Sequence, residues 1–200
     1  MGRKIIFATS NQGKMKEIRE ILKDCNCEIS SLKDEGIDID IIEDGQTFEE
    51  NALIKANTIM KITDSLVLAD DSGLEVDYLN KEPGIYSARY LGEDVSQDEK
   101  NKYILCKLEG QEDKDRTARF VCSIACAIPG QESFTVRGIM EGKIAHNIAG
   151  DNGFGYDPIF LVKEYNKTVA ELDSDEKNKI SHRGRALRLM KKKLIEMGII

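Results

Sequence analysis

Two adjacent carboxylates, Asp70 and Asp71, follow the apolar run of residues 66–69 and precede Ser72 and Gly73. We expect the run to be a buried strand, and α/β sheets bind ligands at the ends of such strands. Adjacent buried carboxylates repel each other, so a divalent cation or a set of hydrogen bonds must offset their charge. Because successive strand residues face opposite sides, one aspartate of the pair is expected to point into a cleft. The alternative is a solvated turn over residues 70–73.

Two further charged residues could join this acidic pair. Glu43 precedes Gly45 in a predicted loop and could supply a third carboxylate, whereas Lys55 on a predicted helix could contact a phosphate. Taken alone, each is indistinguishable from an ordinary surface charge. Mg²⁺ takes hard oxygen ligands and shares its coordination shell with phosphates. The carboxylates are therefore candidate ligands of Mg²⁺.

A polar loop near the N-terminus has the composition of a phosphate-binding turn. It lies where a predicted strand meets a predicted helix, so the first backbone N–H groups of that helix are available to an anion. It is not a Walker loop, because Ala8 and Met15 stand where that motif needs Gly and Ser or Thr. The alternative is a capped loop with an exposed lysine. The candidate phosphate-binding residues are Thr9, Ser10, Asn11, Gln12, Gly13 and Lys14.

An aromatic segment before the predicted strand 158–162 could bind a nucleobase. Phe154, Gly155, Tyr156 and Asp157 combine two aromatic rings, a glycine that leaves room for a base, and a carboxylate. Aromatic faces stack on bases. The alternative is ordinary aromatic packing where the chain enters a strand.

Donor side chains gather near the start of the last predicted helix. His182 and Arg183 can both donate to a carbonyl oxygen, and Lys177 lies one helical turn earlier. Such donors favour a base that carries a keto group over one that presents an amino group. The alternative is a cluster of salt bridges at the helix start.

Hydrophobic periodicity places these segments in an α/β domain with a mixed sheet. Strands are expected at 4–8, 28–32, 66–69, 116–128, 133–140 and 158–162, with a half-exposed strand or an extended loop at 37–42. Helices are expected from Lys14, from the capping box of Thr47 and Glu50 to about 62, and from that of Ser96 and Glu99 to about 108. The last helix is expected to bury Ile180, Leu187, Met190 and Leu194 on one face.

Length and composition indicate one soluble globular domain over residues 1–200, with 40% hydrophobic and 32% charged residues. The net charge of −7 argues against a nucleic-acid binder, which needs a basic face. The longest apolar run, residues 124–128, is far below the ~20 residues that span a membrane. The N-terminal segment lacks the apolar core of a secretory signal, and five cysteines, an odd number, favour reduced thiols in a cytoplasmic protein.

Taken together, these segments resemble the inosine triphosphate pyrophosphatase family, whose members hydrolyse deaminated purine nucleoside triphosphates. The resemblance runs in family order through nearly the whole chain. The matching stretches are 9–14, 43–52 with Lys55, 69–74, 83–90, 154–158 and 181–184.

The resemblance implies roles for the candidate residues. Thr9, Asn11 and Lys14 would hold phosphates with help from Lys55, and Glu43 and Asp71 would bind Mg²⁺. Asp71 would also accept a proton from the attacking water. The nucleoside would contact Ser72, Phe154, Gly155, Tyr156, Asp157, Lys177, His182 and Arg183.

The resemblance also implies an elongated α/β fold around a twisted mixed sheet, a homodimer, and dITP, ITP or XTP as substrate, cleaved to a monophosphate and pyrophosphate. Two alternatives stay open from the sequence. One is a pyrophosphatase that acts on modified pyrimidine nucleotides or on dUTP and UTP. The other is a nucleotide sensor without turnover.

Overall fold

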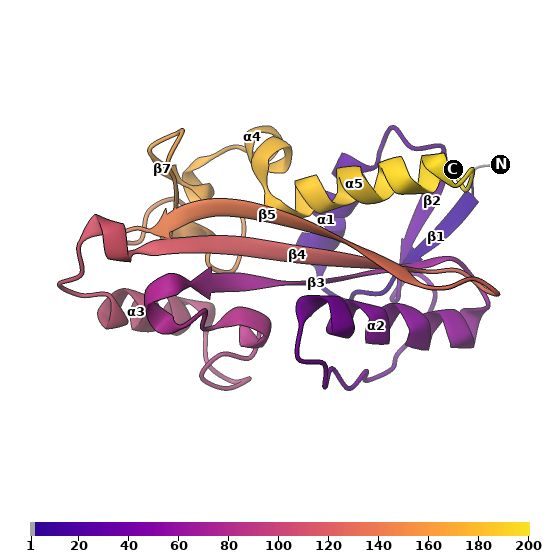
Figure 1. The fold of residues 1–200 in the computed structure, drawn as a ribbon, viewed down its shortest axis with the longest axis horizontal. Coiled ribbons are helices and arrows are strands. Elements are labelled where there is room, and N and C mark those ends of the chain that lie inside the picture. The colour runs from indigo at the N-terminus through magenta and orange to yellow at the C-terminus, as the bar shows by residue number, and fades with distance from the viewer. Residues whose placement is uncertain (1–2) are drawn as a thin grey trace. The chain divides into compact units, whose positions relative to one another are not determined.

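The computed structural model describes residues 3–200, and it confirms the predicted α/β class with a mixed sheet (Figure 1). The strands are β1 Arg3–Phe7, β2 Cys27–Ser31, β3 Val67–Val76, β4 Thr117–Ala127, β5 Phe134–Ile144, β6 Phe160–Val162 and β7 Lys167–Thr168. The α-helices are α1 Gln12–Ile21, α2 Phe48–Thr63, α3 Gln97–Lys107, α4 Ser174–Ile180 and α5 His182–Glu196. Short 3-10 helices cover Asp77–Leu79, Gly84–Tyr86, Asp113–Asp115, Asp157–Ile159 and Val169–Glu171.

The strands follow one another across the sheet in the order β2-β1-β3-β4-β5-β6-β7. Strand β1 is parallel to both β2 and β3, whereas β6 is antiparallel to both β5 and β7. Strands β4 and β5 are neighbours joined only by residues 128–133, as the sequence predicts for a hairpin. Parallel and antiparallel pairs therefore coexist in the sheet.

The chain divides into two compact units. The first comprises the described residues up to Asp71 together with Cys122–Gly138 and Arg183–Ile200. The second comprises Ser72–Val121 and Ile139–His182. The boundaries fall within β3, β4 and β5 and next to the first residue of α5, so both units contain parts of the same long strands.

Strand alternation gives the first unit two hydrophobic cores. Helices α1 and α5 cover one face of its strands, and α2 covers the other (Figure 1). On β3, for example, Leu68 packs into the core with α1 and α5, whereas Val67 and Ala69 pack into the core with α2. Because side chains alternate along a strand, the two residues that follow must also face opposite helices. These two residues are Asp70 and Asp71.

The second unit has a core of its own. It is built from β3 beyond Asp71, from helix α3 and from the strands and loops that lead to α4. Phe120 and Phe160 lie at its centre, with their ring centroids 4.4 Å apart. Buried residues from the 3-10 helices, including Tyr156 and Ile159, pack into the same core. This packing fixes the segment that carries the predicted base-binding residues.

The structure corrects the predicted end of the strand at Asp70. Strand β3 continues through residues 70–73 to Val76, so these residues do not form the solvated turn considered from the sequence. Asp70 and Asp71 are both buried. Cationic side chains bind each carboxylate, as described below, and this compensation lets two turn-forming residues stay inside a strand.

One other predicted element also differs. The last helix is two helices, because Ser181 ends α4 with an extended backbone and α5 begins at His182. Ile180 therefore belongs to α4 and not to the buried face of α5. Residues 37–42 form a loop, which is one of the two forms expected for them from the sequence. The capping box of Ser96 and Glu99 forms as predicted.

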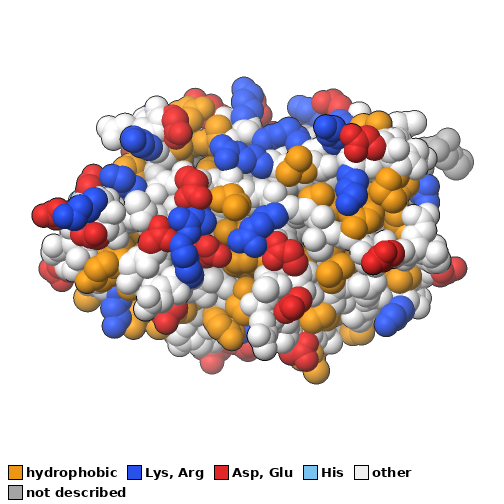
Figure 2. Space-filling model, viewed as in Figure 1, with side chains coloured by type: hydrophobic (Ala, Val, Ile, Leu, Met, Phe, Trp, Pro, Cys, Tyr) orange, Lys and Arg blue, Asp and Glu red, His pale blue; other side chains and the backbone are white. Residues whose placement is uncertain are grey.

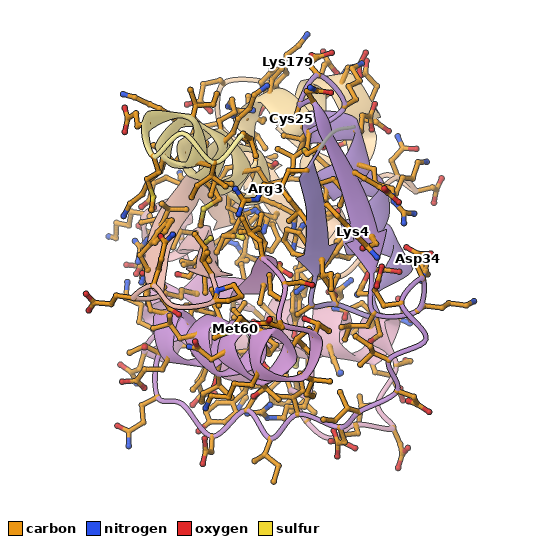
Figure 3. The ribbon with its side chains drawn as sticks, turned by 90° about the vertical axis from the view of Figure 1, so that its right-hand side faces the viewer. Arg3, Lys4, Cys25, Asp34, Met60 and Lys179 are labelled. Carbon is orange, nitrogen blue, oxygen red and sulfur yellow. The ribbon has the colours of Figure 1, made fainter. Side chains whose placement is uncertain are left out.

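The surface carries charges of both signs. Lysine, arginine, aspartate and glutamate side chains are interspersed on the face seen in Figure 2. In the first unit, Lys4 of β1 binds Glu35 at 2.7 Å in the turn after β2, and Arg19 of α1 binds Asp34 of the same turn at 2.6 Å. Figure 3 shows Lys4 and Asp34 at one edge of the strands. These ion pairs fasten the turn to β1 and α1. Among residues 3–200, the helices are all too short or too polar to span a bilayer.

Candidate active site

The strongest concentration of buried charge in the first unit surrounds Asp70 and Asp71. Helices α1, α2 and α5 each contribute a cation that binds one of these two carboxylates. The loop before α2 contributes Glu43, which binds the same lysine as Asp71. We call this group the ionic cluster. Its members are Lys14, Glu17, Glu43, Asn51, Lys55, Asp70, Asp71 and Arg183.

Asp71 faces α2. The Nζ atom of Lys55 lies 3.2 Å from Oδ1 of Asp71 and 2.7 Å from Oε2 of Glu43. These two carboxylate oxygens can therefore be no farther apart than the sum of the two distances. Asn51 donates from Nδ2 to Oδ2 of Asp71 at 3.3 Å and accepts the backbone N–H of Gly45 at 2.9 Å. Asn51 thus ties Asp71 to the loop that carries Glu43.

The surroundings of Asp71 disfavour the charged form of its carboxylate. Burial raises the pKa of Asp71, and the negative charges of Glu43 and Asp70 add to that rise, against the lowering effect of the nearby lysines. Burial acts to lower the pKa of Lys55, but the surrounding carboxylates, with Asp71 foremost, outweigh it and raise that pKa. An ammonium shared by two carboxylates leaves this side of the cluster with excess negative charge. Such a site favours a further cation.

Asp70 faces α1 and α5. In contrast to Asp71, its surroundings favour the charged form of its carboxylate. Its Oδ2 atom lies 3.0 Å from Nζ of Lys14 and 3.2 Å from Nη2 of Arg183. Arg183 in turn donates from Nη1 to Oε2 of Glu17 at 2.6 Å. Burial alone would raise the pKa of Asp70, but the cations, with Lys14 and Arg183 acting most strongly, hold that pKa well below its ordinary value. Asp70 is therefore an ionised carboxylate enclosed by cations.

The side of the cluster at Asp71 fits a magnesium ion. Glu43 and Asp71 offer hard oxygen donors that already converge on one cation. Burial is the main cause of the raised pKa of Asp71, so its charged form lacks full compensation there. Within residues 3–200, no group of three or more His, Cys, Asp or Glu side chains is arranged to hold a metal by itself. Mg²⁺ is usually bound by one or two carboxylates together with water and substrate phosphates.

The predicted phosphate-binding loop ends in the first turn of α1, which begins at Gln12, earlier than the predicted Lys14. Asn11 caps the helix, because its Oδ1 atom accepts the backbone N–H of Lys14 at 3.0 Å. The hydroxyl of Thr9 accepts the N–H of Asn11 at 3.2 Å. Ser10, Asn11 and Gln12 are exposed, whereas Gly13 and Lys14 are half-buried. The loop therefore combines an exposed helix start with a lysine that is bound to Asp70.

The second unit holds the other predicted residues in what we call the aromatic cluster, made up of Phe120, Phe154, Gly155, Tyr156, Asp157, Lys177 and His182. Lys177 binds Asp157 at 2.6 Å, and both side chains are buried. The ammonium of Lys177 lies 4.7 Å from the centre of the Phe154 ring, and the backbone N–H of Phe154 donates to Asp157 at 2.9 Å. The ring of His182 stacks on Phe120 with 4.8 Å between centroids.

Backbone contacts hold this segment in place. The hydroxyl of Tyr156 donates to the carbonyl of Ser87 at 2.9 Å, and Asn101 donates to the carbonyl of Gly155 at 3.3 Å. Gly153 has a φ of +77°, and a Cβ atom there would collide with the carboxylate of Asp157. A glycine is therefore required at position 153 both by the backbone and by the carboxylate beside it.

The predicted site residues divide between the units. The ionic cluster contains Lys14, Glu43, Lys55, Asp71 and Arg183, and the loop 9–13 leads into it. The aromatic cluster contains Phe154, Gly155, Tyr156, Asp157, Lys177 and His182. Ser72 is half-buried in β3, directly after Asp71 in the chain.

Sequence reasoning did not assign a role to several residues that the structure places in these clusters. They are Glu17, Asn51 and Gly153. Asn51 carried a detectable signal, because asparagine is a poor helix former and yet stands in the second turn of a predicted helix. Glu17 carried no such signal, since an isolated glutamate on a helix is usually an ordinary surface charge.

The sheet carries two buried carboxylates on β3, and cations from α1, α2 and α5 bind them. Such a mixed α/β sheet defines a class of protein that can bind phosphate through a metal. The comparison of sequences then gives the family. This chain belongs to the Ham1 family, whose model matches residues 5–193.

Curated relatives cover nearly the whole chain. A dITP/XTP pyrophosphatase of Bacillus licheniformis is 54% identical over 186 residues, which are 93% of this chain and 95% of the relative. A protein of the same name from Bacillus subtilis is 51% identical over 189 residues, covering 94% of this chain and 96% of the relative. These names confirm the resemblance expected from the sequence.

Solved structures of relatives share the fold. The Ham1 protein of Staphylococcus aureus has a TM-score of 0.87 and is 42% identical, with 98% of this chain and 100% of that chain covered. A HAM1 protein from Coxiella burnetii has a TM-score of 0.88 and is also 42% identical, with coverage of 97% and 99%.

Proposed function

We propose that this protein is a pyrophosphohydrolase that converts dITP, ITP and XTP to the nucleoside monophosphate and pyrophosphate. The names of its relatives support this substrate class and this reaction. Within the chain, the observation that carries the proposal is the convergence of Glu43 and Asp71 on the ammonium of Lys55. Such a pair of carboxylates beside a lysine suits a metal-bound triphosphate.

Mg²⁺ is the proposed cofactor, and Glu43 and Asp71 are its proposed ligands. When bound, the ion supplies electrophilic stabilisation of the charge that develops on the phosphate oxygens. Asp71 is also the proposed proton acceptor for the water that attacks the α-phosphorus. Its raised pKa suits that role, because a carboxylate of higher pKa is a stronger base.

The cations of the ionic cluster bind the triphosphate. Lys14 and Lys55 offset its negative charge, and Thr9, Ser10, Asn11, Gln12 and Gly13 provide donors at the start of α1. Both lysines are bound to carboxylates in the absence of substrate, which holds their long side chains in place. Stabilisation of developing charge by such fixed cations is the largest expected contribution to the rate.

The nucleoside is recognised by Ser72, Phe154, Gly155, Tyr156, Asp157, Lys177, His182 and Arg183. Donors from His182 and Arg183 match a 6-keto group. An adenine amino group would place another donor against these donors, and a buried donor that loses its acceptor costs about 1–3 kcal/mol. The proposal therefore includes rejection of dATP relative to dITP. It also includes a homodimer and a cytoplasmic location.

Product identification tests the proposed function. The full-length protein is incubated with dITP and Mg²⁺, and the products are separated by ion-exchange chromatography. We expect dIMP and pyrophosphate in equal amounts. Release of dIDP and phosphate would exclude the proposed reaction, and intact dITP would favour a nucleotide sensor. Parallel incubations with XTP, dATP, dUTP and UTP distinguish this specificity from that of a pyrimidine nucleotide pyrophosphatase.

A further inference from the structure

Asp70 is a carboxylate that binds two site cations but is itself out of reach of a ligand. Its side chain has no exposed surface, whereas 17% of the side chain of Lys14 is exposed. Lys14 is therefore the partly exposed member of this ion pair, and Asp70 is the enclosed one. Asp70 can act on the phosphates of the substrate through this lysine.

Lys14 lies at a place in its helix where a cation needs a negatively charged partner. Lys14 lies in the first turn of α1 and Arg183 lies in the first turn of α5. Cations are disfavoured there, because the helix dipole puts positive charge at the N-terminus. A buried carboxylate beside both helix starts offsets this repulsion and fixes the direction of each side chain.

A chain of contacts holds Asp70 in turn. Glu17 binds Nη1 of Arg183 at 2.6 Å, and Nε and Nη2 of Arg183 point to Oδ2 of Asp70 at 3.4 and 3.2 Å. The guanidinium is buried and planar, so two carboxylates on two of its sides leave it little freedom to turn. The same oxygen of Asp70 then faces the ammonium of Lys14.

We propose that Asp70 is a positioning residue, which Arg183 and Glu17 hold in place and which aims Lys14 at the phosphates of the substrate. This inference rests on the proposed function, because it assigns Lys14 to the phosphates. It gives the two neighbouring aspartates different tasks, since Asp71 serves the metal and the attacking water. Asp70 contacts neither.

Binding of inorganic pyrophosphate to the full-length protein in the presence of Mg²⁺ tests the proposal by calorimetry without turnover. Asp70→Asn removes a negative charge near the anion, so electrostatics alone would tighten binding. Loss of positioning instead weakens binding, and we expect a roughly tenfold increase in Kd. In the double variant with Lys14→Gln, we expect binding no weaker than in Lys14→Gln alone. Tighter or unchanged binding in Asp70→Asn, or additive losses in the double variant, would overturn the proposal.

Glu17→Gln provides a second variant that keeps both cations and the Asp70 carboxylate. It loosens Arg183 only, so we expect Kd to rise about two- to threefold, and an unchanged Kd would count against the contact chain. Glu49→Gln is the matched control, because Glu49 also lies on a helix and binds an arginine, Arg137, at 3.0 Å outside the ionic cluster. Its Kd should equal that of the wild type, and a Kd raised as much as that of Glu17→Gln would also overturn the proposal.

The outcome for the wild type separates this inference from the proposed function. If the wild type cleaves dITP but the Asp70→Asn protein binds pyrophosphate as the wild type does, only the positioning role fails. If the wild type neither cleaves dITP nor binds pyrophosphate, the proposed function fails and the positioning role with it. Thermal unfolding of each variant confirms that it is folded before binding is measured.

Discussion

The ionic cluster of the first unit and the aromatic cluster of the second unit each contain a buried lysine bound to a carboxylate, but their surroundings differ. Lys55 is shared by two carboxylates, and one of them, Glu43, is 29% exposed. Lys177 binds the buried carboxylate of Asp157 and lies over the ring of Phe154, and the side chains of Lys177 and Asp157 are both less than a tenth exposed.

This difference indicates different tasks. A lysine between two carboxylates leaves negative charge that a metal ion can neutralise. We therefore expect the contacts among Lys55, Glu43 and Asp71 to rearrange when a ligand binds. A single buried pair is already neutral. We therefore interpret the contact between Lys177 and Asp157 chiefly as an anchor that shapes the loop around Phe154.

The largest expected effect of a substitution is on turnover in the ionic cluster. Asp71→Asn keeps the size of the side chain but removes the base, so kcat with dITP should fall by about 10²- to 10⁴-fold. Steady-state assays of pyrophosphate release measure the change, with Glu49→Gln as a control of similar chemistry. Retention of most of the turnover would show that Asp71 is not the base.

The next largest expected effect is on the free energy of unfolding, and it compares Lys177 with Lys55. Lys177→Met leaves the buried carboxylate of Asp157 without its ammonium, and we expect a loss of about 3–5 kcal/mol in the free energy of unfolding. Lys55→Met should cost less, because Glu43 stays in partial contact with water. Urea unfolding measures both variants.

Added magnesium provides a second test of the difference between Lys55 and Lys177. Added Mg²⁺ should recover part of the stability that Lys55→Met loses, because the ion replaces the missing positive charge between two carboxylates. It should leave Lys177→Met unchanged. Equal recovery in both variants would contradict the distinction between Lys55, which two carboxylates share, and Lys177, which pairs with the buried carboxylate of Asp157.

A smaller effect is expected where the aromatic cluster is fastened to its own unit. Tyr156→Phe removes the hydroxyl that donates to the buried carbonyl of Ser87, at a cost of about 1 kcal/mol in the free energy of unfolding. Chemical denaturation of the two proteins measures this loss. If Tyr156 only fixes the segment, the KM for dITP should change less than it does in Lys177→Met, and a larger change in Tyr156→Phe would indicate that its hydroxyl contacts the nucleoside.

Local pattern predicted much of this structure. Alternation of apolar residues predicted the strands, and the Ser96 capping box predicted the start of α3. The continuation of β3 through Asp70 and Asp71 could not be predicted in the same way, because it depends on cations from distant helices. Strand alternation did predict that the two aspartates face opposite sides. Which partners they meet there is a property of the tertiary fold.

The candidate site shows the same limit. Lys14, Lys55 and Asp71 belong to short motifs with recognisable composition, so sequence alone could select them. Glu17 could not be selected, because its importance comes from Arg183, which is 166 positions away in the chain. The break between α4 and α5 at Ser181 was missed because residues 174–183 contain no glycine or proline and Ile180 stands in helical register with Leu187.

The smallest expected effect concerns the opposite pKa shifts of the neighbouring aspartates. The pKa of Asp71 is raised by burial, so its contribution to stability is present at low pH and is lost as the pH rises through the raised value. The pKa of Asp70 is lowered, so its contribution is present above the ordinary aspartate pKa of about 3.9 and is lost only as the pH falls below it.

Asp71→Asn should therefore raise the melting temperature slightly at pH 8 in the absence of Mg²⁺, and this gain should vanish as the pH falls towards 4. Asp70→Asn should lower the melting temperature at pH 8, because it removes an ionised partner of the buried Arg183 and the half-buried Lys14, and the deficit should persist to lower pH. Calorimetric scans of both variants and the wild type between pH 4 and pH 8 measure the two differences. Parallel curves for the two variants would mean that the aspartates share one electrostatic environment, and the division of tasks between the two faces of β3 would then be wrong.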